Sequence, residues 1–156
     1  MILKLDDDHG RALDVDAPLA RGAMEAAHDF FELSLDHLCV AGLDGFFRQV
    51  NPSWTRSLGW TAEELMSSPT IAFVHPDDVE MTLAGRERLR LGSSLEALVN
   101  RYACKDGTYR WLEWRSFART EHGLVYACAR DVTDRKLAEQ QLVEARAPLL
   151  HSDARD

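Results

Sequence analysis

Histidine, cysteine and acidic residues are the side chains of this chain that could carry catalysis or hold a metal ion. The six histidines are scattered over 156 residues. No motif of a metalloprotease, a serine hydrolase or a phosphate-binding loop is present. Asp77 and Asp78 form an acidic pair, but they follow His75-Pro76, which is typical of a helix start. Carboxylates at that position interact favourably with the helix dipole. The sequence therefore predicts a chain that is not an enzyme.

Cysteine usage and charge narrow the function classes further. Cys39, Cys104 and Cys128 lack a CxxC spacing and fall in segments of strand-like composition, which favours buried, reduced thiols over a disulfide or a metal site. A net charge of −8 opposes nucleic-acid binding, which needs clustered Lys and Arg. We find no signal peptide and no apolar run near the ~20 residues of a membrane span. We therefore expect a cytoplasmic protein that does not insert into a membrane.

Five segments have the composition of β-strands. Residues 95–130 are rich in β-branched and aromatic side chains, and two glycine-containing turns divide them into three antiparallel strands. Upstream, residues 37–43 and 46–50 flank Asp44-Gly45, a strong hairpin signal.

Three short helices are expected between these two groups of strands, because three helix-start signals lie there. Asn51 and Pro52 suit an N-cap and the first helical position. The run from Thr61 to Glu64 is a capping box. The third helix is expected to begin after His75 and to end near Gly92.

Helices are also expected near both ends. Residues 17–35 have one apolar face. The helix after Thr133 carries apolar residues at the 4-3-4 spacing of a short coiled coil, and Pro148 should end or bend it. We expect residues 151–156 to be disordered and residues 1–16 to form a small hairpin or a loose leader.

These elements predict an α+β fold, with a five-stranded antiparallel sheet and short helices over one face. The expected organisation is an N-terminal extension and cap helix at 1–28, a central domain at 29–132, and a C-terminal helix and tail at 133–156.

A series of short motifs is spread between about residue 30 and residue 142. They are Leu43-Asp44-Gly45, Val50-Asn51-Pro52, Leu58-Gly59-Trp60, Glu63-Glu64-Leu65, His75-Pro76-Asp77-Asp78, Arg101, Lys105-Asp106-Gly107, Trp111 and Asp131-Val132-Thr133-Asp134-Arg135-Lys136. In their order and spacing they resemble a PAS domain, the last one being similar to its PAC-type C-terminal motif. The resemblance implies a PAS-like sheet that encloses a pocket. It also implies a sensory or dimerisation role upstream of a histidine kinase, a diguanylate cyclase or another output domain.

The resemblance makes cofactor binding testable by residue. LOV-type domains carry a reactive cysteine after the second helix; Thr70 stands near that place and forms no thiol–flavin adduct. Their polar flavin contacts are replaced by Tyr102, Leu112 and Ala129, which disfavours FMN photochemistry. Haem-binding members use a histidine on the long helix, and residues 76–91 contain none. No cofactor is therefore expected, although non-covalent FAD stays open because its contacts are diffuse.

Strand alternation predicts which side chains line the pocket. Asn100 is the polar group on a mainly apolar wall, so it either orients a ligand or bonds a helix backbone or a water; we favour the second. The predicted lining is Cys39, Ala41, Leu98, Asn100, Tyr102, Leu112, Trp114, Ser116, Val125, Ala127 and Ala129.

Two functions remain open. In the first, the domain senses a small ligand or a redox cue and relays it through Asp131 and Thr133 to the C-terminal helix, acting on an output domain or a separate signalling protein. Asp131 could equally be a static helix cap. In the second, the domain is a ligand-free dimerisation module. Trp111, on the sheet face opposite the pocket, and Phe31 would then lie on the surface covered by the N-terminal helix or by the second copy of a homodimer. The sequence does not identify a ligand.

Overall fold

The computed structural model describes residues 5–6, 12–13 and 17–153, and these residues form two compact units that are divided between Ser34 and Leu35. In the first unit, strand β1 (Leu5–Asp6) pairs antiparallel with β2 (Ala12–Leu13), and helix α1 (Ala17–Leu33) follows. The small hairpin, one of two alternatives for the leader, is therefore present.

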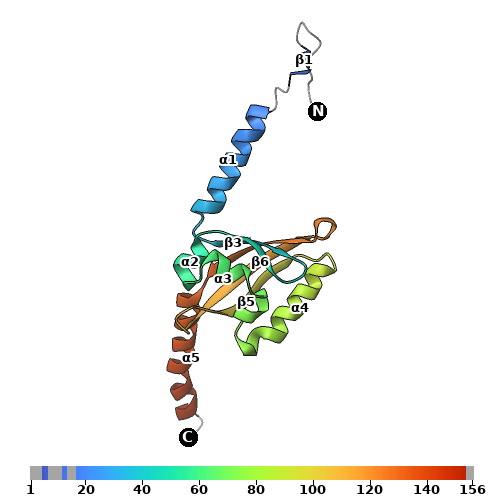
Figure 1. Ribbon diagram of the computed structural model, residues 1–156. Coiled ribbons are helices and arrows are strands. Elements are labelled where there is room, and N and C mark those ends of the chain that lie inside the picture. The colour runs from blue at the N-terminus through green and yellow to red at the C-terminus, as the bar shows by residue number, and fades with distance from the viewer. Residues whose placement is uncertain (1–4, 7–11, 14–16, 154–156) are drawn as a thin grey trace. The chain divides into compact units, whose positions relative to one another are not determined.

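The second unit is built on a five-stranded antiparallel sheet (Figure 1), which confirms the predicted fold class. The strand order is β4-β3-β7-β6-β5, so the last strand lies beside the first strand of the unit. The strands are β3 (His37–Gly42), β4 (Phe47–Val50), β5 (Leu95–Ala103), β6 (Tyr109–Arg119) and β7 (Leu124–Asp131).

Short helices connect β4 to β5 and pack on one face of the sheet (Figure 1). They are α2 (Ser53–Leu58), α3 (Ala62–Met66), the 3₁₀ turns η1 (Thr70–Phe73) and η2 (Pro76–Asp78), and α4 (Val79–Arg90). A third 3₁₀ turn, η3 (Thr120–His122), joins β6 to β7, and α5 (Thr133–Asp153) follows the sheet.

The core of this unit lies between the helices and the sheet. Trp54 of α2 and Leu65 of α3 are fully buried against Tyr102, Leu112 and Ala129 of the strands. Burial of large apolar side chains contributes about 1.5–3 kcal/mol each, so this layer holds the short helices in place.

A second, smaller core cluster holds α4 on β5. It is formed by Leu89, Leu95 and Leu98. Gly85 of α4 faces this cluster, and a Cβ atom there would lie 2.8 Å from Cδ1 of Leu98. The absence of a side chain at Gly85 therefore permits a close approach of the helix to the strand.

The outer edge of β5 is irregular. The register with β6 shifts between Leu95 and Leu98, and Ala97 within this bulge has φ 57°. The bulge turns both leucines inward, although they are three residues apart. Further along the edge, the His75 N–H donates to the Arg101 carbonyl at 2.9 Å.

Of the predicted helix starts, the one at Thr61 is confirmed and the one at Asn51 is wrong. Thr61 forms the predicted capping box. Asn51 does not hold the predicted N-cap position: Pro52 holds it, and the Asn51 amide accepts from the Leu38 N–H at 3.0 Å. The hydrogen bond of Asn51 to Leu38 of β3, 13 residues earlier, explains this difference.

At the C-terminal end, helix α5 continues past Pro148 to Asp153. The last three residues of the predicted tail lie outside the described part.

Candidate functional site: a cavity beneath helix α4

A cavity of about 120 Å³ lies between the sheet and helix α4. Nine of the eleven residues predicted from strand alternation line it: Cys39, Ala41, Leu98, Asn100, Tyr102, Trp114, Ser116, Val125 and Ala127. The other two, Leu112 and Ala129, point to the same side of the sheet but are fully buried in the core beside the cavity.

The opposite wall comes from segments that strand alternation does not address. Thr82, Arg86 and Leu89 of α4 line the cavity, as does Thr70 of η1. The three α4 residues follow the i, i+4, i+7 spacing of one helix face, which is the signal that could have grouped them. The turn between β3 and β4, including Gly45, completes the wall.

The Asn100 amide is satisfied by side chains of the protein. Its Nδ2 donates to the Thr82 hydroxyl at 3.1 Å, and its Oδ1 accepts from the Trp114 indole N–H at 2.7 Å. The Thr82 hydroxyl in turn donates to the Asp78 carbonyl at 2.7 Å. The sequence led us to expect a backbone or water partner, and the bonds instead run from α4 through β5 to β6.

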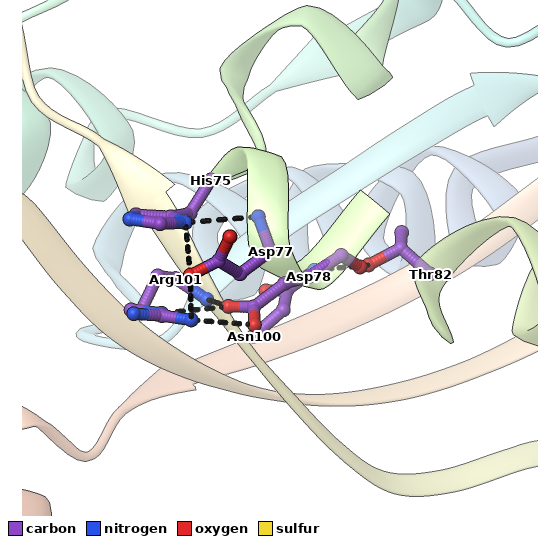
Figure 2. Close-up of polar contacts among 6 residues, drawn as sticks. All are labelled: His75, Asp77, Asp78, Thr82, Asn100 and Arg101. Carbon is purple, nitrogen blue, oxygen red and sulfur yellow. Dashed lines mark hydrogen bonds and ion pairs between the residues drawn. The ribbon is translucent and has the colours of Figure 1, made fainter. Parts of the chain in front are cut away.

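Asp78 anchors the start of this chain of hydrogen bonds to the sheet edge (Figure 2). Its carboxylate accepts from the Arg101 backbone N–H at 2.8 Å and from the guanidinium at 2.9 and 3.0 Å. The Arg101 guanidinium lowers the pKa of Asp78, and the same bond raises the pKa of Arg101. The sequence analysis explained Asp78 by helix capping, but its carboxylate makes no cap bond and serves as the partner of Arg101. His75 accepts from the Asp77 N–H instead.

Arg86 is the other partly buried arginine of α4 and β5, and its environment is different. Its Nη2 donates to the Thr70 hydroxyl. No carboxylate of the described residues pairs with it. Burial lowers the pKa of Arg86, because the guanidinium loses water and none of these carboxylates compensates its charge.

Cys39 and Tyr102 are the other titratable groups of the strands that line the cavity. Burial raises the pKa of the Cys39 thiol to about 12. Burial also raises the pKa of Tyr102, whose hydroxyl donates to the Thr70 carbonyl at 3.1 Å. Both groups stay protonated at neutral pH, so neither provides a nucleophile.

The start of α5 is bonded to β6. The Thr133 hydroxyl accepts from the Trp111 N–H at 3.0 Å and donates to Asp131 Oδ1 at 2.6 Å. The Thr133 N–H donates to the same carboxylate oxygen at 2.9 Å, and the Val132 N–H donates to the Trp111 carbonyl at 2.8 Å. Four hydrogen bonds therefore hold the start of α5 to the sheet, two to Trp111 of β6 and two to Asp131 at the end of β7.

The Trp111 ring lies on the sheet face opposite the cavity. Two cations of the same unit lie over it, Arg101 at 5.0 Å and Lys136 at 5.4 Å from the ring centroid. These contacts cover part of the surface that the sequence analysis assigned to a helix or a second copy. Phe31, the other residue predicted for that surface, lies on α1 in the first unit.

Searches for a metal site and for a membrane span give negative results within the described residues. No three His, Cys, Asp or Glu side chains of these residues gather closely enough to hold a metal ion. None of the helices described is both long and apolar enough to cross a bilayer.

Solved structures with the same fold include several signalling proteins. A domain of a sensory box sensor histidine kinase/response regulator from Geobacter sulfurreducens is 20% identical, with a TM-score of 0.64 over 72% of this chain and 96% of that one. A sensory box histidine kinase/response regulator from Burkholderia thailandensis is 24% identical, with a TM-score of 0.64 over 78% and 98%. An RNA-binding light-oxygen-voltage receptor is 22% identical, with a TM-score of 0.66 over 93% and 42%.

Family membership rests on a sequence model. A comparison with curated proteins finds no significant match. The solved structures, at 20–24% identity, establish the fold. The model of the PAS fold matches residues 47–128, which is more than half of the chain and contains most of the cavity wall. The chain therefore belongs to the PAS family, as its sequence motifs indicated.

Proposed function

We propose that this PAS domain is the sensory module of a cytoplasmic signalling protein of a histidine kinase or diguanylate cyclase pathway. In this proposal a small ligand occupies the cavity beneath α4, and its presence is relayed to α5. The chain itself performs no catalysis; a separate output domain or signalling protein responds to the helix.

The observation that carries this proposal is the double role of β6. Trp114 of this strand lines the cavity and bonds Asn100. Trp111, three residues earlier on the opposite face, donates its backbone N–H to Thr133 of α5, and its carbonyl accepts from the N–H of Val132, the residue just before the helix. A ligand that displaces Trp114 or Asn100 would move the strand to which α5 is attached. A relay needs two states with different ligand affinities, and the bonds at Thr133 are the element we propose to differ between them.

Native mass spectrometry and the absorbance spectrum of the purified chain would show whether a small molecule is retained. Amide hydrogen exchange over the first turns of α5, with and without that molecule, then tests the relay. Ligand-dependent protection of this segment is expected. Protection confined to α4 and the cavity walls would contradict a relay through α5.

The chain offers a matched pair of variants for this experiment. Thr133→Val removes the hydroxyl that bonds Trp111 and Asp131. Thr108→Val removes a hydroxyl with the same geometry toward Asp106, at 2.6 Å, in the β5–β6 turn away from α5. The first variant should abolish the ligand-dependent change in α5, and the second should retain it.

A ligand-free dimerisation domain is the second candidate. The satisfied Asn100 amide and the small volume of the cavity favour it, since sites for drug-sized ligands span about 300–1,000 Å³. The sheet face opposite the cavity also presents Phe117, which is 52% exposed and stacks on Tyr126 at 5.5 Å. We propose this face as the homodimer surface. Phe117→Asp should then convert a dimer to a monomer in sedimentation velocity.

The small volume of the cavity also argues against a bound cofactor. We propose that the domain functions without flavin or haem. Thr70 stands where photoreactive relatives carry a cysteine, α4 contains no histidine, and a cavity of about 120 Å³ is small for an isoalloxazine ring. A visible absorbance band of a flavin or a haem in the purified chain would contradict this proposal.

A further inference from the structure

Arg86 brings an uncompensated positive charge to the wall of the cavity. Its guanidinium carries five N–H donors, and the described residues provide one acceptor, the Thr70 hydroxyl. A second arginine of α4, Arg90, also lines the cavity, at its exposed end, and pairs with Glu87 at 3.5 Å. The chain as a whole has 26 acidic and 18 basic residues, yet no Asp or Glu is among the residues that line the cavity. The cavity is therefore locally positive in an acidic protein.

The remaining wall is mainly apolar. Leu98, Val125 and Ala127 face the space from the sheet, and Leu89 faces it from α4. One further polar group is free: the Ser116 hydroxyl lines the cavity and has no hydrogen-bond partner within the described residues. A matching ligand needs an apolar body, an anionic end for Arg86 and no second charge.

The volume sets the size of this body. A cavity of about 150 Å³ with apolar walls holds a benzene molecule, so about 120 Å³ suits a ligand whose apolar part is no larger than one ring. A carboxylate fits the guanidinium with two parallel hydrogen bonds. A phosphate monoester carries up to two charges and three oxygens that need donors. Arg86 alone does not compensate two charges, and the other lining arginine, Arg90, is already paired with Glu87.

We propose that the cavity binds a small monocarboxylate with an apolar or aromatic body of at most about six non-hydrogen atoms, and that Arg86 pairs with its carboxylate. This inference rests on the proposed sensory function and names the class of its ligand. It adds Arg86 to the site as the specificity-determining residue. The ligand replaces the counter-charge that the protein does not provide, so binding should also restore the stability that the isolated guanidinium costs.

Isothermal titration calorimetry of the purified chain with sodium benzoate, and with benzamide as its neutral isostere, tests this assignment. Benzoate should bind and benzamide should bind at least about 10-fold more weakly, because charge-assisted hydrogen bonds are the stronger ones. Arg86→Gln should weaken benzoate binding by about 10- to 100-fold and weaken benzamide binding by clearly less, because the neutral amide loses a hydrogen bond but no charge pair. Arg86→Lys, which keeps the charge but not the planar fork, should fall between the wild type and Arg86→Gln.

The matched control is Arg88→Gln. Arg88 is an exposed arginine of the same helix that does not line the cavity, so this variant should bind benzoate as the wild type does. A thermal unfolding curve for each variant excludes loss of fold as the cause, and the comparison of the two probes on the wild type does not depend on any variant.

The outcomes separate this inference from the function on which it rests. Equal affinities for benzoate and benzamide, or equal benzoate binding by wild type and Arg86→Gln, would overturn the carboxylate assignment and leave a neutral-ligand sensor standing. No binding of either probe up to about 10 mM would overturn the assignment as well. If no co-purified molecule were found in addition, the sensory function would fail with it.

Discussion

Arg101 and Arg86 show how the same side chain is used at the sheet edge and at the cavity. The Arg101 guanidinium pairs with the Asp78 carboxylate, which also accepts from the Arg101 backbone N–H. The guanidinium also lies over the Trp111 ring. Arg86 has one hydroxyl and no counter-charge among the described residues. The difference appears in their pKa values, which hydrogen bonding to Asp78 raises for Arg101 and burial lowers for Arg86. The charge of Arg101 is therefore paired within the chain, whereas no carboxylate of the described residues pairs with Arg86.

The largest effect should follow from breaking the edge. Asp78→Ala leaves the Arg101 guanidinium and backbone N–H without their acceptor. The Arg101 side chain is only 26% exposed and the Asp78 side chain only 12%, so water replaces the lost bonds poorly. We expect a loss of about 3 kcal/mol in the free energy of unfolding, measured by urea denaturation. Asp77→Ala is the control, because Asp77 is 76% exposed and lies 3.9 Å from Arg101. Equal losses in both variants would refute the special role of Asp78.

The next effect concerns the hydrogen bonds between edge and cavity. Asn100→Leu leaves the Trp114 indole N–H unpaired in the cavity wall and should cost about 2 kcal/mol. The double variant with Trp114→Phe should cost less than the sum of the two single variants, because the unpaired donor is then removed. Strict additivity in denaturation experiments would show that the two side chains are not coupled.

His37 is a third basic side chain in the interior, and its burial favours the neutral imidazole over the charged form. Its Nδ1 donates to the Ala129 carbonyl at 3.1 Å, and its buried Nε2 has no hydrogen-bond partner in the described part of the chain. Burial lowers its pKa from 6.5. The unfolded chain therefore takes up a proton at higher pH than the folded one. Stability should be full above pH 6.5 and fall as the pH drops through the lowered pKa, by about 1.4 kcal/mol for each unit of the shift.

Unfolding free energies measured at several pH values between about 7.5 and 5 test this expectation. His37→Gln should flatten the decline. His122→Gln, at an exposed histidine, should keep it. A decline of the same slope in all three proteins would assign the pH dependence to other groups.

The smallest effect is expected at Arg86 itself. Arg86→Leu removes a desolvated charge that has no partner carboxylate, so the free energy of unfolding should change by less than about 0.5 kcal/mol or increase. Arg101→Leu should instead cost about 2 kcal/mol, since Asp78 is then left unpaired. If Arg86→Leu destabilised the chain as much as Arg101→Leu, the guanidinium would be structural, and the comparison between edge and cavity would not hold.

Sequence patterns predicted the side of the sheet that each strand residue faces, because side chains alternate along a strand with a fixed period. Trp114 and Asn100 were placed in the wall from this rule alone. The rule does not say where a cavity ends and solid core begins. Leu112 and Ala129 therefore share the predicted side but pack against the short helices.

The lining residues that sequence reasoning missed include side chains of α4 and η1 and the turn between β3 and β4. Arg86 and Thr82 reach the cavity because of how α4 is rotated against β5, and this depends on the close approach at Gly85. Thr70 of η1 reaches it through contacts far apart in sequence, such as its carbonyl's hydrogen bond from Tyr102. The pairing of Asp78 with Arg101 was missed for the same reason. A local signal, two carboxylates at a helix start, explained Asp78 adequately, whereas its partner lies 23 residues away.

The bulge at Ala97 has a consequence for how partners can reach the sheet. A regular outer strand would offer a row of free amides and carbonyls to which a foreign strand could be added. Here the bulge interrupts the first half of that row, and His75 and Asp78 occupy the Arg101 carbonyl and N–H in the second half. Growth of the sheet by strand addition is therefore blocked at the β5 edge, and a partner on this side of the domain would have to contact side chains instead of extending the sheet.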